Sequence, residues 1–294
     1  MRSVDYALSY ERLLEKLTVE YGYDRAMELV VGGLYAESGM LEASALIHLG
    51  LGPEQTLVDV GCGSGRLPFA LRSYLRGKFV GTDILAPTLD YARQKCDRRD
   101  WEFIPVDRVL IPVANLSADF VTFFSVFTHL LDEDIFKFLI EAKRVLKPDG
   151  CVVFSFLDFD CDSHWPLFLK TVDESDPNRV LNKFTTKGAI RRLVRGAALQ
   201  VQTIFDGQER WVPLSTPVAL ENSGTMEGVV EFGQSVAVCT HFPEVDYLSK
   251  YQDVKEAVTA GFFRSGAHHY EVCGHAEGRR LDGAARNGTQ VDVC

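Results

Sequence analysis

One short stretch, VDVGCGSG at residues 58–65, restricts the fold of this chain more than any other part of the sequence. Its three glycines, Gly61, Gly63 and Gly65, alternate directly after an apolar run that carries the acid Asp59. Glycine lets the backbone adopt turns that other residues resist, and it lets a ligand come close to the chain. The stretch therefore predicts a strand followed by a tight turn that lies against a small molecule.

The surrounding sequence predicts an α/β fold. Short apolar runs alternate with stretches of helical period between about Leu57 and Thr240, which is typical of a mostly parallel sheet with helices on both faces. The seven expected strands are TLVDVGC, KFVGTDI, WEFIPV, DFVTFFSV, GCVVFSFL, LQVQTIF and FGQSVAVCT. Their nearly continuous apolar character indicates burial on both faces of the sheet.

Four regions differ in pattern. We expect residues 1–50 to form a helical extension beside the sheet or over its ligand edge, and residues 51–241 to form the main domain. Residues 242–281 predict a small helical module. The end of the chain, residues 282–294, has no periodic pattern, and we expect it to be disordered.

Within the main domain, two connections are longer than a simple loop needs to be. They run from Asp158 to Lys183 and from Asp206 to Gly228. Loops of this length usually carry function, so we expect them on the substrate side. Trp165 and Trp211 lie in these segments and offer flat apolar faces for a sugar, or core residues for a lid.

Composition excludes several classes of protein. The net charge of −10 leaves no surplus of cations for phosphates, so we expect no nucleic acid partner. No apolar run approaches the roughly 20 residues that cross a bilayer, and acids interrupt the N-terminal segment where a signal peptide is apolar. We therefore expect no membrane span and a cytoplasmic location. The seven scattered cysteines are expected to be reduced thiols without a metal.

The order of the glycines narrows the ligand. Arg66 stands where the dinucleotide-binding motif has its third glycine, and the turn lacks the lysine of a phosphate-binding P-loop. These departures argue against a nicotinamide or flavin dinucleotide and against a nucleoside triphosphate. A flat or zwitterionic ligand such as an adenosyl amino acid fits the pattern.

On these residues the chain resembles the class I S-adenosylmethionine-dependent methyltransferases, which have a Rossmann-like sheet. VDVGCGSG resembles their first motif, and GTDI, IPVD, FFSVFTHL and RVLKPDGCVVFSFL follow in the family's order between about Leu57 and Thr240. The resemblance implies S-adenosyl-L-methionine as cofactor, with Asp83 on the ribose hydroxyls, Ile84 against the adenine and Asp107 near the adenine amino group. The implied cofactor-binding residues are Asp59, Gly61, Cys62, Gly63, Gly65, Asp83, Ile84, Asp107 and Ser125.

The methyl acceptor decides which catalytic groups are needed. An alcohol holds its proton at neutral pH, so a base or a metal has to assist its methylation. His129, just after the fourth expected strand, is the first candidate for that base, and Asp158 is the second candidate catalytic residue. The alternative for His129 is a residue that only packs or caps a helix.

An acidic cluster, LDFDCDSHW, follows the fifth expected strand. Asp158, Asp160, Asp162 and His164 are oxygen and nitrogen ligands suited to Mg²⁺. The same residues could instead form a solvated acidic turn or bind a substrate hydroxyl directly. The N-P-P-[YF] motif of amino-methylating enzymes is absent after the fourth strand, which disfavours an exocyclic amine as acceptor.

The tail suggests a context for the reaction. Leu248, Tyr251, Val254 and Val258 predict one helix that ends at Gly261, and Ala267, Tyr270 and Cys273 predict a second that ends at Gly274. The segment resembles a short helical module at the ends of bacterial glycosyltransferases and cell-surface polysaccharide enzymes. That resemblance implies a sugar or glycan hydroxyl as acceptor and a glycosyltransferase partner for residues 242–281. The alternatives are another small metabolite, or a scaffold or sensor that binds S-adenosylmethionine without turnover.

Overall fold

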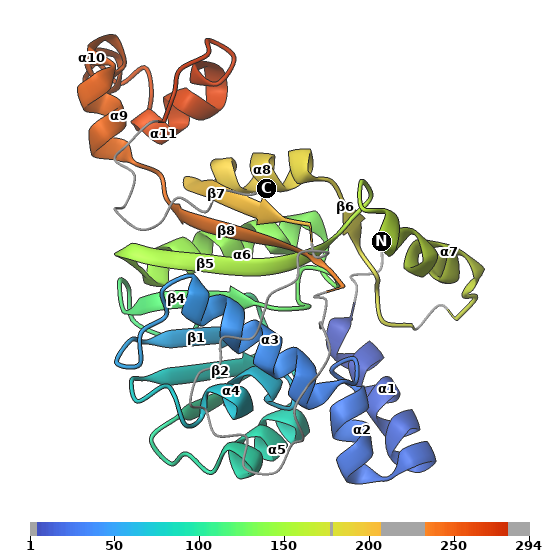
Figure 1. Ribbon diagram of the computed structural model, residues 1–294. Helices are drawn as coiled ribbons and strands as arrows, with labels where there is room; N and C mark the ends of the chain where they lie inside the picture. Colours follow the sequence, from blue (N-terminus) through green and yellow to red (C-terminus); the bar gives the residue numbers. More distant parts are fainter. Residues whose placement is uncertain (1–4, 177–178, 207–232, 282–294) are drawn as a thin grey trace.

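The strands predicted from the sequence form one eight-stranded, mostly parallel sheet in the order β3-β2-β1-β4-β5-β8-β7, with β6 paired to β5 (Figure 1). The computed structural model describes residues 5–176, 179–206 and 233–281. The strands are β1 (Leu57–Val60), β2 (Phe79–Asp83), β3 (Glu102–Pro105), β4 (Ala118–Phe123), β5 (Leu146–Asp158), β6 (Phe184–Thr185), β7 (Leu199–Phe205) and β8 (Ser235–His241). Only the two-residue β6 was not predicted, because it is too short to leave a periodic signal.

Alternate side chains of the strands build two cores, one on each face of the sheet. Val58 and Val60 pack with α6 (Asp132–Val145) and α8 (Lys187–Gly196) on one face. Leu57 belongs to the core on the other face, which α3, α4 and α5 cover. Those helices are α3 (Tyr35–His48), α4 (Arg66–Leu71) and α5 (Ala86–Cys96). The period of two therefore explains why helices cover both faces, as predicted.

Local sequence fixes the ends of α6. Three acids, Asp132, Glu133 and Asp134, stand in its first turn, and Lys143 and Arg144 stand in its last turn. This charge order matches the helix dipole, which favours anions at the N-terminus and cations at the C-terminus.

The N-terminal region is helical, as predicted, and its first two helices form a small core beside the sheet. The helices α1 (Tyr6–Tyr21) and α2 (Tyr23–Leu29) share a small core with Leu85 and Tyr91, and they lie at the same end of the strands as α7 (Figure 1). The third helix, α3, packs on the sheet itself, because Ala43 and Leu46 are part of its core.

Of the two segments expected to be long loops, the structure describes nearly all of the first and little of the second. Residues 158–183 contain a 3-10 turn (Asp162–His164) and α7 (Trp165–Asp173), so part of this segment is helix. Trp165 packs on Phe168, with ring centroids 5.0 Å apart. Most of the second segment, with Trp211, lies outside the described residues, as does the predicted tail at residues 282–294.

The C-terminal module stands above α8 (Figure 1). It comprises α9 (Glu244–Lys250), α10 (Gln252–Thr259), α11 (Gly266–His269) and a π-helical turn (Tyr270–Gly274). The prediction of one continuous first helix was wrong, since the helix breaks at Tyr251 between α9 and α10. Glu271 attaches the module to α8 by ion pairs with Arg192 and Arg195. Among the described residues, no helix combines the length and the apolar character that crossing a bilayer requires.

Candidate active site

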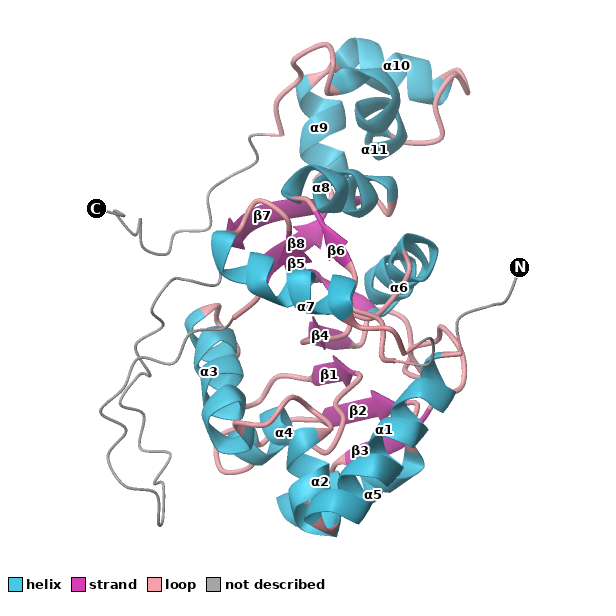
Figure 2. Cartoon of the chain, turned by 90° about the vertical axis from the view of Figure 1, so that its right-hand side faces the viewer, coloured by secondary structure: helices cyan, strands magenta, loops and turns pink. Residues whose placement is uncertain are grey.

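A cavity of about 1000 Å³ lies at the carboxyl ends of the parallel strands β1 and β4, where successive strands change from one side of β1 to the other. Open α/β sheets bind ligands at this position, because the loops there diverge and leave a crevice. Figure 2 shows this end of the sheet, with α1, α2 and α7 arranged around it. The predicted site residues that line the cavity are Gly61, Cys62, Gly63, Asp83, Ile84, Asp107, Ser125 and His129.

The glycine turn after β1 presents bare backbone to this cavity. Gly61 and Gly63 have φ angles of +72° and +54°, in the left-handed region that glycine tolerates best. A Cβ atom at Gly61 or Gly63 would lie within 3.0 Å of Val126 or Val31, respectively. Gly65 does not line the cavity. It lets the start of α4 approach Ala92 of α5.

Asp83, at the end of β2, is held beside the glycine turn by two backbone hydrogen bonds. Its two carboxylate oxygens accept from the amides of Gly63 and Leu85, each at 2.9 Å. Each oxygen keeps further acceptor capacity, which suits a vicinal diol. Burial raises the pKa of Asp83, and the amide hydrogen bonds oppose that rise. Ile84 next to it is 38% exposed, and Asp107 is exposed in the loop after β3.

Asp59 lies behind the turn and does not line the cavity among the described residues. Its carboxylate is buried and accepts a hydrogen bond of 2.7 Å from the hydroxyl of Thr122. Burial raises the pKa of Asp59 to about 8, although this hydrogen bond and the charge of Arg66 act in the opposite direction. Its position on β1 explains the placement, since the side chain shares the sheet face of Leu57.

A buried ion pair at the cavity was not anticipated from the sequence. Arg66 Nη2 lies 2.5 Å from Oε1 of Glu42, whose side chain is 3% exposed. Arg66 also donates to the carbonyl of Val31 at 2.6 Å and to the hydroxyl of Ser125 at 3.1 Å. The second oxygen of Glu42 has no hydrogen bond partner among the described residues. The position of Arg66 in the glycine turn marked it as unusual in the sequence. Its partner Glu42 lies on α3, and no local sequence pattern links the two residues.

His129 lines the same cavity from the segment after β4. Its Nδ1 lies 2.6 Å from the carbonyl oxygen of Leu181. A carbonyl only accepts, so Nδ1 carries the proton and the lone pair of the neutral ring is on Nε2. Burial lowers the pKa of His129. The ring of Tyr10, from α1, packs edge-on at 5.7 Å and also lines the cavity, a contribution that the sequence did not indicate.

The acidic cluster after β5 is arranged differently from the prediction. Asp158 is fully buried outside the lining of the cavity, and one of its oxygens accepts from the amide of Asp160. The other oxygen lies 3.8 Å from Nζ of Lys187. Nδ1 of His164 lies 2.8 Å from the amide nitrogen and 3.1 Å from the carbonyl oxygen of Asp158. Asp158 and His164 therefore contact the local backbone and Lys187, and neither lines the cavity. The structure does not support the magnesium site expected at Asp158, Asp160 and His164.

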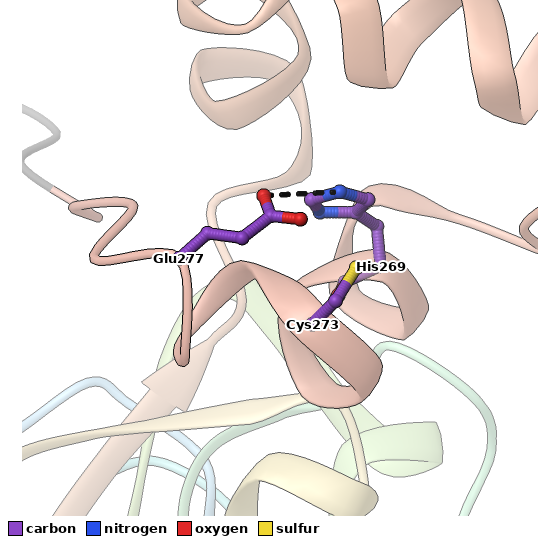
Figure 3. Close-up of side chains that lie close together, drawn as sticks. All are labelled: His269, Cys273 and Glu277. Carbon is purple, nitrogen blue, oxygen red and sulfur yellow. Dashed lines mark hydrogen bonds and ion pairs between the residues drawn. The ribbon is translucent and has the colours of Figure 1, made fainter.

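Within the described ranges, the side chains that do converge like metal ligands lie in the C-terminal module. Ligand atoms of His269, Cys273 and Glu277 lie within 4.8 Å of one another (Figure 3). Glu277 already accepts from Arg279 at 3.0 Å, and Nδ1 of His269 lies 3.0 Å from the hydroxyl of Tyr247. These partners give the group a role in holding the module together.

Comparison with known proteins agrees with this geometry. Residues 58–154 match the family model described as a methyltransferase domain. This match agrees with the motifs by which the sequence resembles S-adenosylmethionine-dependent methyltransferases. The matched segment runs from β1 through the core of β5 and therefore includes the glycine turn, Asp83 and His129.

One curated relative of the methyltransferase domain is the malonyl-[acyl-carrier protein] O-methyltransferase of Hahella chejuensis (strain KCTC 2396). It is 34% identical over 107 residues, which cover 36% of this chain. The chain spans only 38% of that relative's length.

Two solved structures share the fold. The magnesium protoporphyrin IX methyltransferase of Synechocystis PCC 6803, solved with bound S-adenosylhomocysteine, is 14% identical, with a TM-score of 0.53 over 79% of this chain and 99% of that chain. The PH0226 protein of Pyrococcus horikoshii OT3 is 19% identical, with a TM-score of 0.53 over 76% of this chain and 98% of that chain.

Proposed function

We propose that the protein is an O-methyltransferase that uses S-adenosyl-L-methionine and His129 as a general base. The cavity carries this proposal, because it brings the glycine turn, Asp83 and His129 together at about 1000 Å³, a volume in the range of small-molecule sites. The backbone of Gly61 and Gly63 lines the cavity, and the carboxylate of Asp83 has free acceptor capacity. These residues fit an adenosyl amino acid. When bound, S-adenosyl-L-methionine supplies an electrophilic methyl group.

The resemblance to the methyltransferase family suggests the role of each residue that contacts the cofactor. Asp83 would hold the ribose hydroxyls, Ile84 would pack on the adenine, and Asp107 would receive the adenine amino group. Ser125 has a φ angle of +57°, in the left-handed region, and its hydroxyl is tied to Arg66. The strained backbone at Ser125 and the Arg66–Glu42 pair together shape the part of the cavity next to the glycine turn.

The proton of the acceptor goes to His129. The carbonyl of Leu181 keeps the proton on Nδ1, so Nε2 is the free basic nitrogen. Because burial lowers its pKa, the ring is neutral at pH 7 and ready to accept a proton. A hydroxyl needs this help, whereas a carboxylate is already ionised.

For the acceptor we propose a hydroxyl of a sugar or glycan precursor, on the basis of the tail's resemblance to polysaccharide enzymes. A cytoplasmic location and a glycosyltransferase partner at residues 242–281 belong to the same proposal. The relative from Hahella chejuensis supports a second candidate, a carboxyl group on an acyl carrier, because that enzyme is a malonyl-[acyl-carrier protein] O-methyltransferase. The two candidates differ in their need for His129.

The test uses methyl-labelled S-adenosylmethionine with two acceptor panels, free and nucleotide-linked sugars in one and malonyl thioesters in the other. Label in a sugar, lost in His129→Gln, supports the first candidate. Label in a malonyl ester that survives His129→Gln supports the second. Turnover of the cofactor with no label in either panel contradicts both acceptors. Tight cofactor binding without any methyl transfer would support the alternative hypothesis of a scaffold or sensor that binds S-adenosylmethionine.

A further inference from the structure

A second cavity, of about 530 Å³, lies between α8, the edge strand β7 and the C-terminal module. It shares no lining residue with the methyl-transfer cavity. Half of its lining is cationic or imidazole side chains, and none of its lining residues is an acid. The five are Arg191, Arg195, His275, Arg279 and Arg280. In a chain with a net charge of −10, such a concentration of positive charge is local and opposite to the average.

Two of these arginines are neutralised by neighbours. Arg195 Nε pairs with Glu271 at 3.2 Å, and the guanidinium of Arg279 makes two hydrogen bonds to Asp253, at 3.1 and 2.5 Å. Arg191 and Arg280 make no ion pair with any residue in the described ranges. The cavity therefore presents two uncompensated guanidinium groups, one from α8 and one from the segment after the π-helical turn.

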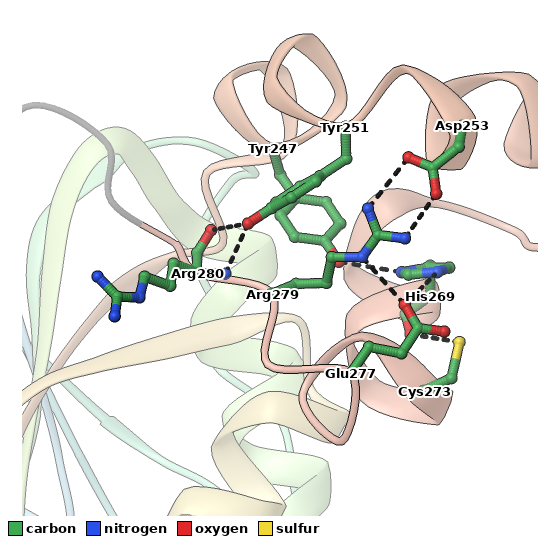
Figure 4. A network of polar contacts seen from close by, with 8 residues as sticks. All are labelled: Tyr247, Tyr251, Asp253, His269, Cys273, Glu277, Arg279 and Arg280. Carbon is green, nitrogen blue, oxygen red and sulfur yellow. Dashed lines mark hydrogen bonds and ion pairs between the residues drawn. The ribbon is translucent and has the colours of Figure 1, made fainter.

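The segment that carries Arg280 is held in place by its neighbours. The hydroxyl of Tyr251 accepts from the amide of Arg280 at 2.8 Å and lies 3.4 Å from its carbonyl oxygen. Arg279, next in the chain, is fixed by Asp253 and by Glu277. Figure 4 shows these contacts, with the guanidinium of Arg280 extending away from the rest of the network. Because the backbone of Arg280 is already held, anion binding has to order only its side chain.

We propose that this cavity binds a small phosphorylated molecule, with its diphosphate between Arg191 and Arg280. A guanidinium group presents paired N–H donors that match phosphate oxygens, and charge-assisted hydrogen bonds of this kind are strong. His275 and Arg195 add donors at the rim, while Leu199 and Tyr270 give an apolar floor for an organic group on the diphosphate. The site is independent of the methyl-transfer cavity and would bind its ligand whether or not the methyl donor is present.

The test is calorimetric titration of the full chain with inorganic pyrophosphate and then with a nucleoside diphosphate. Arg191→Gln and Arg280→Gln should each weaken binding by about tenfold or more, and the double variant should abolish it. Arg264→Gln is the matched control, because Arg264 is exposed in the same module and does not line the cavity. Thermal melts of all variants verify that they fold.

Three results would decide against the site. Pyrophosphate and the nucleoside diphosphate both failing to bind, or binding that is the same in wild type and the double variant, would overturn the proposal. Binding only to vesicles that contain phosphatidylglycerol, without binding of either soluble ligand, would also overturn it and identify a membrane contact. Tighter binding of the nucleoside diphosphate than of pyrophosphate would support a contact between its organic group and the apolar floor at Leu199 and Tyr270.

Discussion

Two histidines follow neighbouring strands of this sheet, yet the structure gives them different surroundings. His129, after β4, lines the cavity, and its Nδ1 faces the carbonyl of Leu181. His164, after β5, is 3% exposed and does not line that cavity, and its Nδ1 lies 2.8 Å from the amide nitrogen and 3.1 Å from the carbonyl oxygen of Asp158. The ring of His129 can therefore meet a ligand in the cavity, whereas the ring of His164 is enclosed by protein. Position at the sheet edge does not identify a base, and access to the cavity does.

The largest expected effect is on turnover at His129. His129→Gln should lower kcat by about 10² to 10⁴-fold if the acceptor is a hydroxyl, since that is the usual contribution of a general base. The wild-type rate should rise with pH through the lowered pKa of His129 and be constant above its ordinary value of 6.5. A pH–rate profile of the wild type and a kcat measurement for His129→Gln check these predictions. Calorimetric titration should give the same cofactor affinity for the variant and the wild type.

His164→Gln is the matched control for this substitution. It removes a buried ring that contacts the backbone of Asp158, so it should lower the melting temperature while kcat stays within about twofold of wild type. A large loss of kcat in His164→Gln, with normal turnover in His129→Gln, would reverse the comparison and place the base after β5.

The second prediction contrasts two buried carboxylates. Glu42 lies 2.5 Å from Arg66, whereas Asp158 lies 3.8 Å from Lys187, which also pairs with Asp206. Arg66→Met should lower the free energy of unfolding by about 3 to 5 kcal/mol, because it leaves Glu42 buried without its partner. Lys187→Met should cost less, since Lys187 is partly exposed. Denaturant titration measures both, and the Arg66→Met, Glu42→Met double variant should recover much of the loss. Equal losses in the two single variants would refute the contrast.

The pairs Glu42–Arg66 and Asp158–Lys187 also show which features of the molecule could be predicted from the sequence. The strands, the helices that cover the sheet and the glycine turn follow from local periodicity. Asp83 ends β2 and His129 lies in the segment after β4, so both reach the edge of the sheet where the cavity lies. Contacts between distant segments leave no such trace. The pairing of Glu42 with Arg66, the ring of Tyr10 beside His129, and the carbonyl of Leu181 all depend on how α1, α3 and the segment after α7 pack. The acidic cluster was misplaced for the same reason, since Lys187 lies on a later helix.

The third prediction concerns the carboxylates at the ends of β2 and β5. Each accepts a backbone amide, but only Asp83 lines the methyl-transfer cavity. Asp83→Asn should weaken S-adenosylmethionine binding by about 1.5 to 3 kcal/mol, the usual worth of hydrogen bonds to a charged group. Asp158→Asn should leave that affinity unchanged. Isothermal titration with the cofactor separates the two, and undiminished affinity in Asp83→Asn would move the ribose elsewhere in the cavity.

The smallest expected effect is that of removing divalent cations. The ammonium of Lys187 lies 3.8 Å from the carboxylate of Asp158, so a positive charge already stands beside the acid that would have held Mg²⁺. Turnover measured with EDTA should therefore equal turnover measured with added Mg²⁺. The sharper version repeats the assay with Lys187→Met, which removes that ammonium. A rate that depends on Mg²⁺ in wild type and more strongly in Lys187→Met would show that the cluster after β5 binds a cation in competition with Lys187. The distinction between the two histidines would then rest on the metal rather than on access to the cavity.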